Sequence, residues 1–108
     1  MNILIDTHTF LWFVSGSNQL PNGLRNKIKD SKVNCYLSIA SLWEIVVKLN
    51  LGKLELDLTL HKLFEYIERN QIQIIHISFN HFLELSTLPK HHKDPFDRLI
   101  ISQAIAEN

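Results

Sequence analysis

Hydrophobic residues along the chain form short runs that are separated by longer segments of mixed polarity. The runs Ile3-Leu4-Ile5, Val33 to Ile39 and Ile72 to Ile77 are brief and contain many β-branched residues. Near-continuous apolar runs of this length are typical of parallel strands that are buried on both faces. These runs therefore predict the strands of one short parallel sheet.

The longer segments carry apolar residues at helical spacing and predict helices. They cover Thr7 to Val14, Pro21 to Asp30, Leu42 to Leu49, Leu58 to Arg69, Phe79 to Leu88 and the segment after Asp94. Strands that alternate with helices in this order predict an α/β sandwich. No linker or internal repeat interrupts the pattern, so residues 1–108 are expected to form one domain.

The last helix begins in the stretch KDPFDR, which is well suited to start a helix. Asp94 is a preferred N-cap residue, and Pro95 has a suitable φ for the first helical position. Asp97 then falls where a negative charge meets the positive end of the helix dipole. Helix capping by itself is therefore a sufficient explanation of both acids.

Three acids nevertheless occupy related positions along the chain. Asp6 follows the first strand, Glu44 lies in the first turn or two of the helix after the second strand, and Asp97 begins the last helix. Open α/β sheets bind ligands at the carboxyl ends of their strands, where these acids are able to converge. Converging carboxylates retain protons or hold a cation, and oxygen ligands suit Mg²⁺ or Mn²⁺.

Each of these acids also has a purely structural explanation. Asp6 is able to cap the helix that follows it. Ser38 or Ser41 is able to cap the helix that carries Glu44, and Ser41 with Glu44 matches the capping-box pattern S-x-x-E in the sequence SLWE. On spacing alone, the metal site is a hypothesis that competes with helix capping.

Composition and charge restrict the possible functions. The formal net charge is +0 with histidine neutral, so the chain is not a strongly basic nucleic-acid binder, and any such contact has to come from local patches. The single cysteine, Cys35, lies in an apolar run and is expected to be a buried thiol. We find no secretory signal and no apolar segment long enough to cross a membrane, so a cytoplasmic location is expected.

Three segments together resemble one known family. ILIDTHTFLW, SIASLWEIVVKLNLGKLEL and HHKDPFDRLIISQA, in this order, are similar to PIN-domain ribonucleases and, more narrowly, to the VapC-type toxins of bacterial toxin–antitoxin pairs. The resemblance implies a three-layer α/β/α sandwich with a short parallel sheet. Members of the family usually continue for about one more strand, which carries a fourth acid, and this sequence stops before it, so we expect that C-terminal strand to be lacking.

The resemblance also implies an activity and a set of site residues. The expected activity is an endoribonuclease that depends on Mg²⁺ or Mn²⁺ and cuts structured RNA such as tRNA or rRNA. By motif position Asp6, Glu44 and Asp97 match the catalytic, metal-binding acids, and Asp94 lies beside them. Thr7 and Ser41 match hydroxyl positions that support the acids.

Partners are implied in the same way. The family pairs with a VapB-like antitoxin, which alone contacts DNA, and usually forms homodimers; Trp12 and the helix Leu42 to Leu49 are candidates for lining the antitoxin groove. A basic cluster of Lys90, His91, His92, Lys93 and Arg98 is a candidate RNA contact or a solvated loop.

Two other functions remain open at this stage. One is a catalytically degenerate PIN domain that only binds partners, and the other is a flavodoxin-like phosphoacceptor domain. We rank the phosphoacceptor last, because the first strand does not end in paired acids.

Overall fold

The apolar runs form a parallel sheet in the computed structural model, which describes residues 1–90 and 93–107. Its strands are β1 (Asn2–Ile5), β2 (Asn34–Ser38) and β3 (Gln73–Ile75), in the order β1-β2-β3. Ile3 pairs with Cys35, and Leu37 pairs with Ile74. The predicted strands are thus confirmed, although β2 and β3 are shorter at both ends than the apolar runs.

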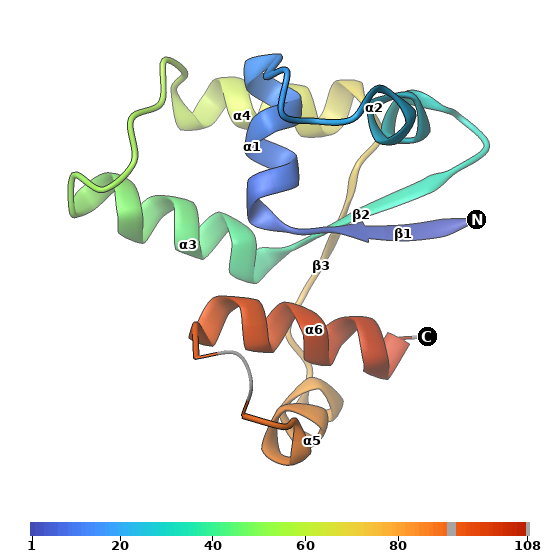
Figure 1. The fold of residues 1–108 in the computed structure, drawn as a ribbon, viewed down its shortest axis with the longest axis vertical. Helices are drawn as coiled ribbons and strands as arrows, with labels where there is room; N and C mark the ends of the chain where they lie inside the picture. The colour runs from blue at the N-terminus through green and yellow to red at the C-terminus, as the bar shows by residue number, and fades with distance from the viewer. Residues whose placement is uncertain (91–92, 108) are drawn as a thin grey trace.

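The helices lie in two layers, one on each side of the sheet (Figure 1). They are α1 (Thr7–Ser15), α2 (Asn22–Lys29), α3 (Ile39–Asn50), α4 (Leu60–Arg69), α5 (Phe79–Thr87) and α6 (Pro95–Glu107). The predicted α/β sandwich with a short parallel sheet is therefore confirmed.

The start of α3 differs from one sequence-based expectation. Ser38 is the N-cap, and its hydroxyl oxygen accepts a hydrogen bond of 3.0 Å from the backbone N–H of Ala40. Ser41 consequently lies inside the helix and is buried. The capping box of Ser41 with Glu44 is wrong, because β2 leads into the helix at Ser38 without an intervening loop.

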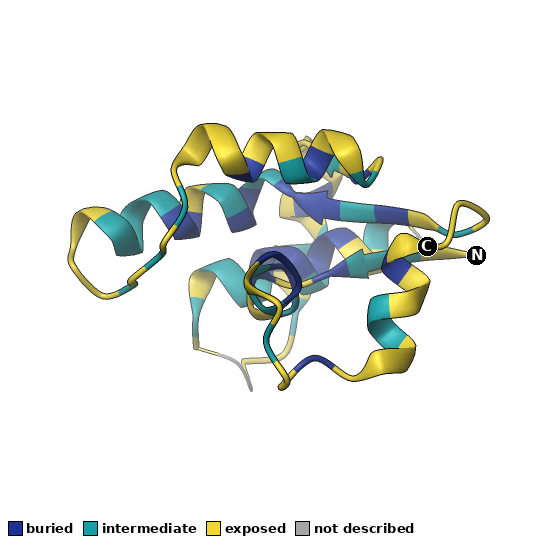
Figure 2. Cartoon of the chain, turned by 90° about the horizontal axis from the view of Figure 1, so that it is seen from above, coloured by how far each residue is buried: buried dark blue, intermediate teal, exposed yellow. Residues whose placement is uncertain are grey.

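A large core lies between the sheet and the layer that contains α1, α2 and α4. Alternate strand residues such as Ile5 and Leu37 point into it, where they meet Phe10 of α1 and Ile67 of α4. Figure 2 shows that the buried positions are concentrated on the strands and on the inward sides of the helices. Cys35 belongs to this core, and burial raises the pKa of its thiol to about 11, which keeps it protonated and unreactive.

A smaller core lies on the opposite face, beneath α6. Leu99 and Ile100 of α6 are buried with Ala40 of α3, and Leu4 of β1 and Leu85 of α5 pack against them. The helix begins near the carboxyl ends of the strands and runs back toward their amino ends (Figure 1). This packing places the first turn of α6 beside the first turns of α3.

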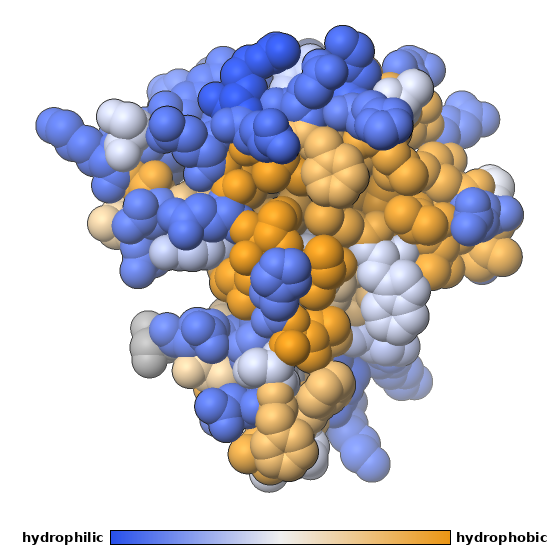
Figure 3. Space-filling view, turned by 180° about the vertical axis from the view of Figure 1, so that it is seen from behind, coloured by the Kyte–Doolittle hydropathy of each residue, from blue (hydrophilic) through white to orange (hydrophobic). Residues whose placement is uncertain are grey.

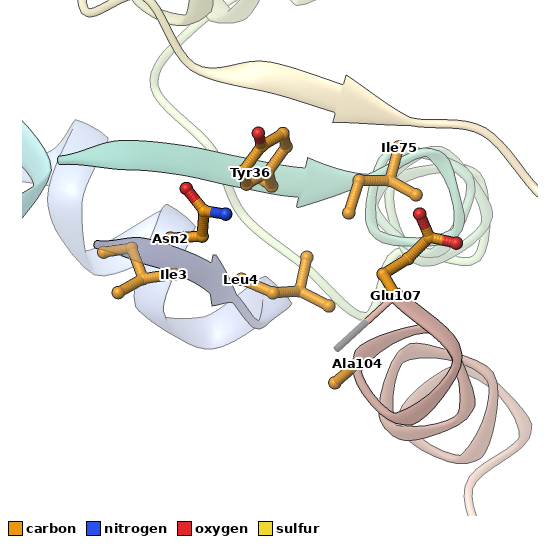
Figure 4. Close-up of a pocket in the computed structure, with 7 residues that line it drawn as sticks. All are labelled: Asn2, Ile3, Leu4, Tyr36, Ile75, Ala104 and Glu107. Atoms are coloured by element: carbon orange, nitrogen blue, oxygen red, sulfur yellow. The ribbon is translucent and has the colours of Figure 1, made fainter.

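A hollow of about 370 Å³ opens at the other end of the same face. It is lined by Asn2, Ile3, Leu4, Tyr36, Ile75, Ala104 and Glu107 (Figure 4). Glu107 is the one acidic residue among them, and none of the predicted site residues lines it. The hollow is therefore separate from the place where the predicted acids lie.

Apolar side chains also remain on the surface. Figure 3 shows them across the middle of the back of the molecule, below a hydrophilic upper part. Large exposed apolar residues include Leu60 and Phe64 on α4 and Phe79, Phe82 and Leu83 on α5. Across residues 1–90 and 93–107, every helix is too short or too polar to span a lipid bilayer.

Candidate functional site

Asp6 follows directly after β1 and caps α1. One of its carboxylate oxygens, Oδ1, accepts a hydrogen bond of 2.8 Å from the backbone N–H of Thr9. The capping role predicted for Asp6 is thus confirmed. Because the side chain is exposed at the carboxyl edge of the sheet, capping leaves it accessible to a ligand.

Glu44 is a buried carboxylate whose two oxygens are both engaged. It is 1% exposed, in the second turn of α3. Thr7 donates a hydrogen bond of 2.7 Å from its hydroxyl to Oε1, and the hydroxyl oxygen of Ser41 lies 2.9 Å from that of Thr7. Lys48, one turn further along α3, holds Oε2 with its Nζ at 2.6 Å.

Thr7, Ser41 and Glu44 therefore form one buried polar group that joins α1 to α3. The loop-free passages from β1 into α1 and from β2 into α3 bring these residues to the same edge of the sheet. A buried charge of this kind is stable only when it is paired and hydrogen-bonded, as it is here.

The KDPFDR segment adds two further acids. Asp94 Oδ1 accepts hydrogen bonds from the backbone N–H groups of Phe96 at 2.8 Å and Asp97 at 3.1 Å, which confirms Asp94 as the cap of α6. Partial burial raises the pKa of Asp97, and the charges of Asp94, Glu44 and Asp6 raise it further, while His8 lowers it. Asp6 follows β1, Glu44 lies in the helix that follows β2, and Asp97 begins α6, whose first turn packs on α3, so the fold places these acids at the carboxyl edge of the sheet.

Aromatic packing fixes the first turn of α6 against α3. The ring of Phe96 meets that of Trp43 edge-on, with 4.9 Å between the ring centroids. Phe96 is the neighbour of Asp97 and Trp43 is the neighbour of Glu44. The contact therefore sets the relative position of the two helices that carry these acids.

Lys48 is the residue of this site that the sequence analysis missed. Its hydrogen bond to Glu44 raises the pKa of the Lys48 ammonium, burial opposes the rise, and the charges of Glu44, Asp94 and Asp97 add to it. The four-residue spacing in the sequence EIVVK, which places both side chains on one side of a helix, is the signal that was available.

The structure describes only part of the predicted basic cluster near the site. His91 and His92 lie outside the described residues. Arg98 donates hydrogen bonds to the backbone carbonyls of Pro89 at 3.1 Å and Leu88 at 3.4 Å. Arg98 thus helps to hold the segment that leads from α5 to α6.

The donor atoms at this edge fit a hard divalent cation. They are carboxylate and hydroxyl oxygens, and the ammonium of Lys48 already occupies a cation position against Glu44. Within the described part of the chain, no three His, Cys, Asp or Glu side chains form a group able to hold a metal ion by themselves. A magnesium ion does not need such a group, because it usually keeps several waters and binds directly to one or two carboxylates.

Comparison with known proteins gives one clear result. The PIN domain family matches residues 3–108, which is nearly the whole chain. Comparison with individual curated proteins gives no significant match. PIN domains are typically nucleases and generally use divalent metals. The extent of the match and the sheet between two helical layers agree, and the chain belongs to the PIN domain family.

Proposed function

We propose that this protein is an endoribonuclease that depends on Mg²⁺ or Mn²⁺ and acts as the toxin of a toxin–antitoxin pair of the VapC type. The observation that supports the nuclease proposal is the position of Asp6, Glu44, Asp94 and Asp97 in or beside elements that begin or end at one edge of the sheet. Carboxylates at one edge repel one another, and among the described acids Lys48 forms an ion pair only with Glu44, so this edge favours the binding of a further cation.

The exposed Asp6 and the half-buried Asp97 are the residues best placed to bind the ion. When bound, a divalent ion activates water and neutralises charge that develops on the phosphodiester. Thr7 and Ser41 orient Glu44 through the buried hydrogen bonds, and Asp94 fixes the backbone of Asp97. The protein's own contribution is thus to hold the carboxylate oxygens in fixed orientations at the proposed metal site.

The toxin assignment rests on the resemblance of the three sequence segments to VapC-type toxins. It includes RNA of the tRNA or rRNA class as substrate, a VapB-like antitoxin, a homodimer and a cytoplasmic location. An apolar groove between α3 and α4, lined by residues that include Leu42, Val46 and Phe64, supports binding of an apolar antitoxin helix.

Cleavage of RNA by the purified chain, free of any partner, tests the proposal. The chain is incubated with total RNA in Mg²⁺, in Mn²⁺ and in EDTA, alongside Asp6→Asn and Asp97→Asn. We expect cleavage with either metal, none in EDTA, and a loss of at least about 100-fold in each variant, because each removes a charge that holds the ion. Asp57→Asn, at an exposed position between α3 and α4, is the matched control and is expected to cleave normally.

Two results would contradict the nuclease proposal. Cleavage that survives both substitutions would show that the acids do not form the active site. Absence of cleavage by the folded chain with either metal would favour the degenerate PIN domain that only binds partners.

A further inference from the structure

We infer that Lys48 is an internal cation of this acidic edge, and that a divalent ion has to displace its ammonium group from Glu44 in order to bind. The inference rests on the proposed function, because it assumes that the edge binds a divalent ion. It goes further by naming a competitor within the protein and the carboxylate for which the two cations compete.

The contacts of Glu44 show why a competition is needed. Oε1 accepts a hydrogen bond of 2.7 Å from the hydroxyl of Thr7, and Oε2 accepts one of 2.6 Å from Nζ of Lys48. A metal ion that binds Glu44 therefore replaces one of these two partners or shares an oxygen with it. Like charges that share a carboxylate repel, so sharing with the ammonium is unfavourable.

Lys48 is the partner that is able to move. Thr7 is 3% exposed, and its hydroxyl is held in the first turn of α1. The side chain of Lys48 is 35% exposed and has a flexible four-carbon stem, so its ammonium has solvent to move into. Displacement of Lys48 opens Oε2, and the bond from Thr7 keeps Glu44 oriented.

The same contact explains the state of the site without metal. A buried carboxylate without a counter-ion is costly, and Asp94 and Asp97 add negative charge close to Lys48. With the ammonium in place, the charge of Glu44 is paired within the protein.

Titration of the purified chain with Mn²⁺, followed by calorimetry, tests the inference without any RNA. Lys48→Met removes the competing charge, and we expect it to tighten Mn²⁺ binding about tenfold, or ~1.4 kcal/mol. Lys53→Met, an exposed lysine just beyond α3, is the matched control and should leave the affinity unchanged. Lys48→Gln keeps a hydrogen-bond donor without the charge, is less disruptive to folding, and should also tighten binding.

A double-mutant cycle separates competition at Glu44 from a general change in charge. In a Glu44→Gln background, Lys48→Met should change Mn²⁺ affinity by less than about twofold. An equal gain in both backgrounds would overturn the inference, since the competition would then not involve Glu44.

The remaining outcomes distinguish the inference from the proposed function. In one outcome the wild type binds Mn²⁺, while Lys48→Met and Lys48→Gln both bind it with equal or lower affinity. That result would overturn the inference but not the proposed function. Absence of Mn²⁺ binding by the wild type and by every variant would overturn both. Binding that appears only after Lys48 is replaced would support the inference.

Discussion

Asp97 shows how the environment of one residue departs from its local sequence. Its place in the first turn of α6 predicts that the helix dipole stabilises its charge. In the folded protein its pKa is raised instead, by partial burial and by the charges of Asp94, Glu44 and Asp6. Partial burial, together with the surrounding acids, therefore outweighs the dipole, and the charged form of Asp97 is disfavoured in the metal-free protein.

Asp97→Asn should consequently make the metal-free protein more stable. In EDTA at pH 7 we expect the free energy of unfolding to rise by up to about 1 kcal/mol, as measured by urea denaturation. Because the folded pKa lies above the ordinary value of 3.8, the gain should shrink as the pH falls through the folded pKa and vanish below 3.8, where the carboxyl is protonated in both states.

Asp57→Asn, in the exposed segment before α4, is the control for the loss of one negative charge. A variant at position 97 that is less stable than the wild type at pH 7 would show that the carboxylate is stabilising in the absence of metal.

At the scale of elements, a buried histidine joins α5 to α6. His81 is 2% exposed, and its Nδ1 accepts a hydrogen bond of 3.0 Å from the backbone N–H of Ser78. Nδ1 is thus unprotonated, so Nε2 carries the proton and donates to Glu107 Oε2 at 3.0 Å. One side chain therefore caps the start of α5 and holds the end of α6.

His81→Leu should remove both of these hydrogen bonds and fill the same space with an apolar side chain of similar size. We expect the free energy of unfolding to fall by about 1–3 kcal/mol, because the two hydrogen bonds that the buried ring makes to Ser78 and Glu107 are lost. His61→Leu, on the exposed side of α4, should change stability by less than about 0.5 kcal/mol in the same denaturation experiment. Equal stability of both variants would show that the histidine does not hold the two helices together.

At the scale of the whole molecule, the two cores have different tasks. The large core between the sheet and α1, α2 and α4 contains most of the buried apolar residues. The small core of Ala40, Leu99 and Ile100 joins α6, which carries Asp97, to α3, which carries Glu44. Damage to the large core should therefore affect mainly stability, whereas damage to the small core should also affect the site.

A matched pair of substitutions tests this division. Ile67→Ala in the large core and Ile100→Ala in the small core remove the same atoms from buried positions. Each should lower the free energy of unfolding by about 2–5 kcal/mol. In Mn²⁺ titrations at low temperature, where both variants are folded, only Ile100→Ala is expected to bind the ion more weakly. The same loss of Mn²⁺ affinity in both variants would contradict the division.

Most of the fold was predictable from the sequence because its signals are local. The strands follow from short runs such as Ile3-Leu4-Ile5, and the start of α6 follows from Asp94 and Pro95. Ends of elements were less predictable: Ser38 and Ser41 are both suitable caps, and only the structure shows that Ser38 is the cap. The acids were predictable as candidates, since each follows a strand or begins a helix at the carboxyl edge of the sheet.

The sequence by itself determined the order of the elements, the capping roles of Asp6 and Asp94, and the family to which the chain belongs. Only the tertiary structure decided that Glu44 is buried with Thr7 and Lys48 as partners, and that the charge of Asp97 is disfavoured. The physical reason is range: capping and periodicity act within one or two turns of the chain, whereas burial and repulsion between carboxylates depend on segments that meet only when the helices pack on the sheet.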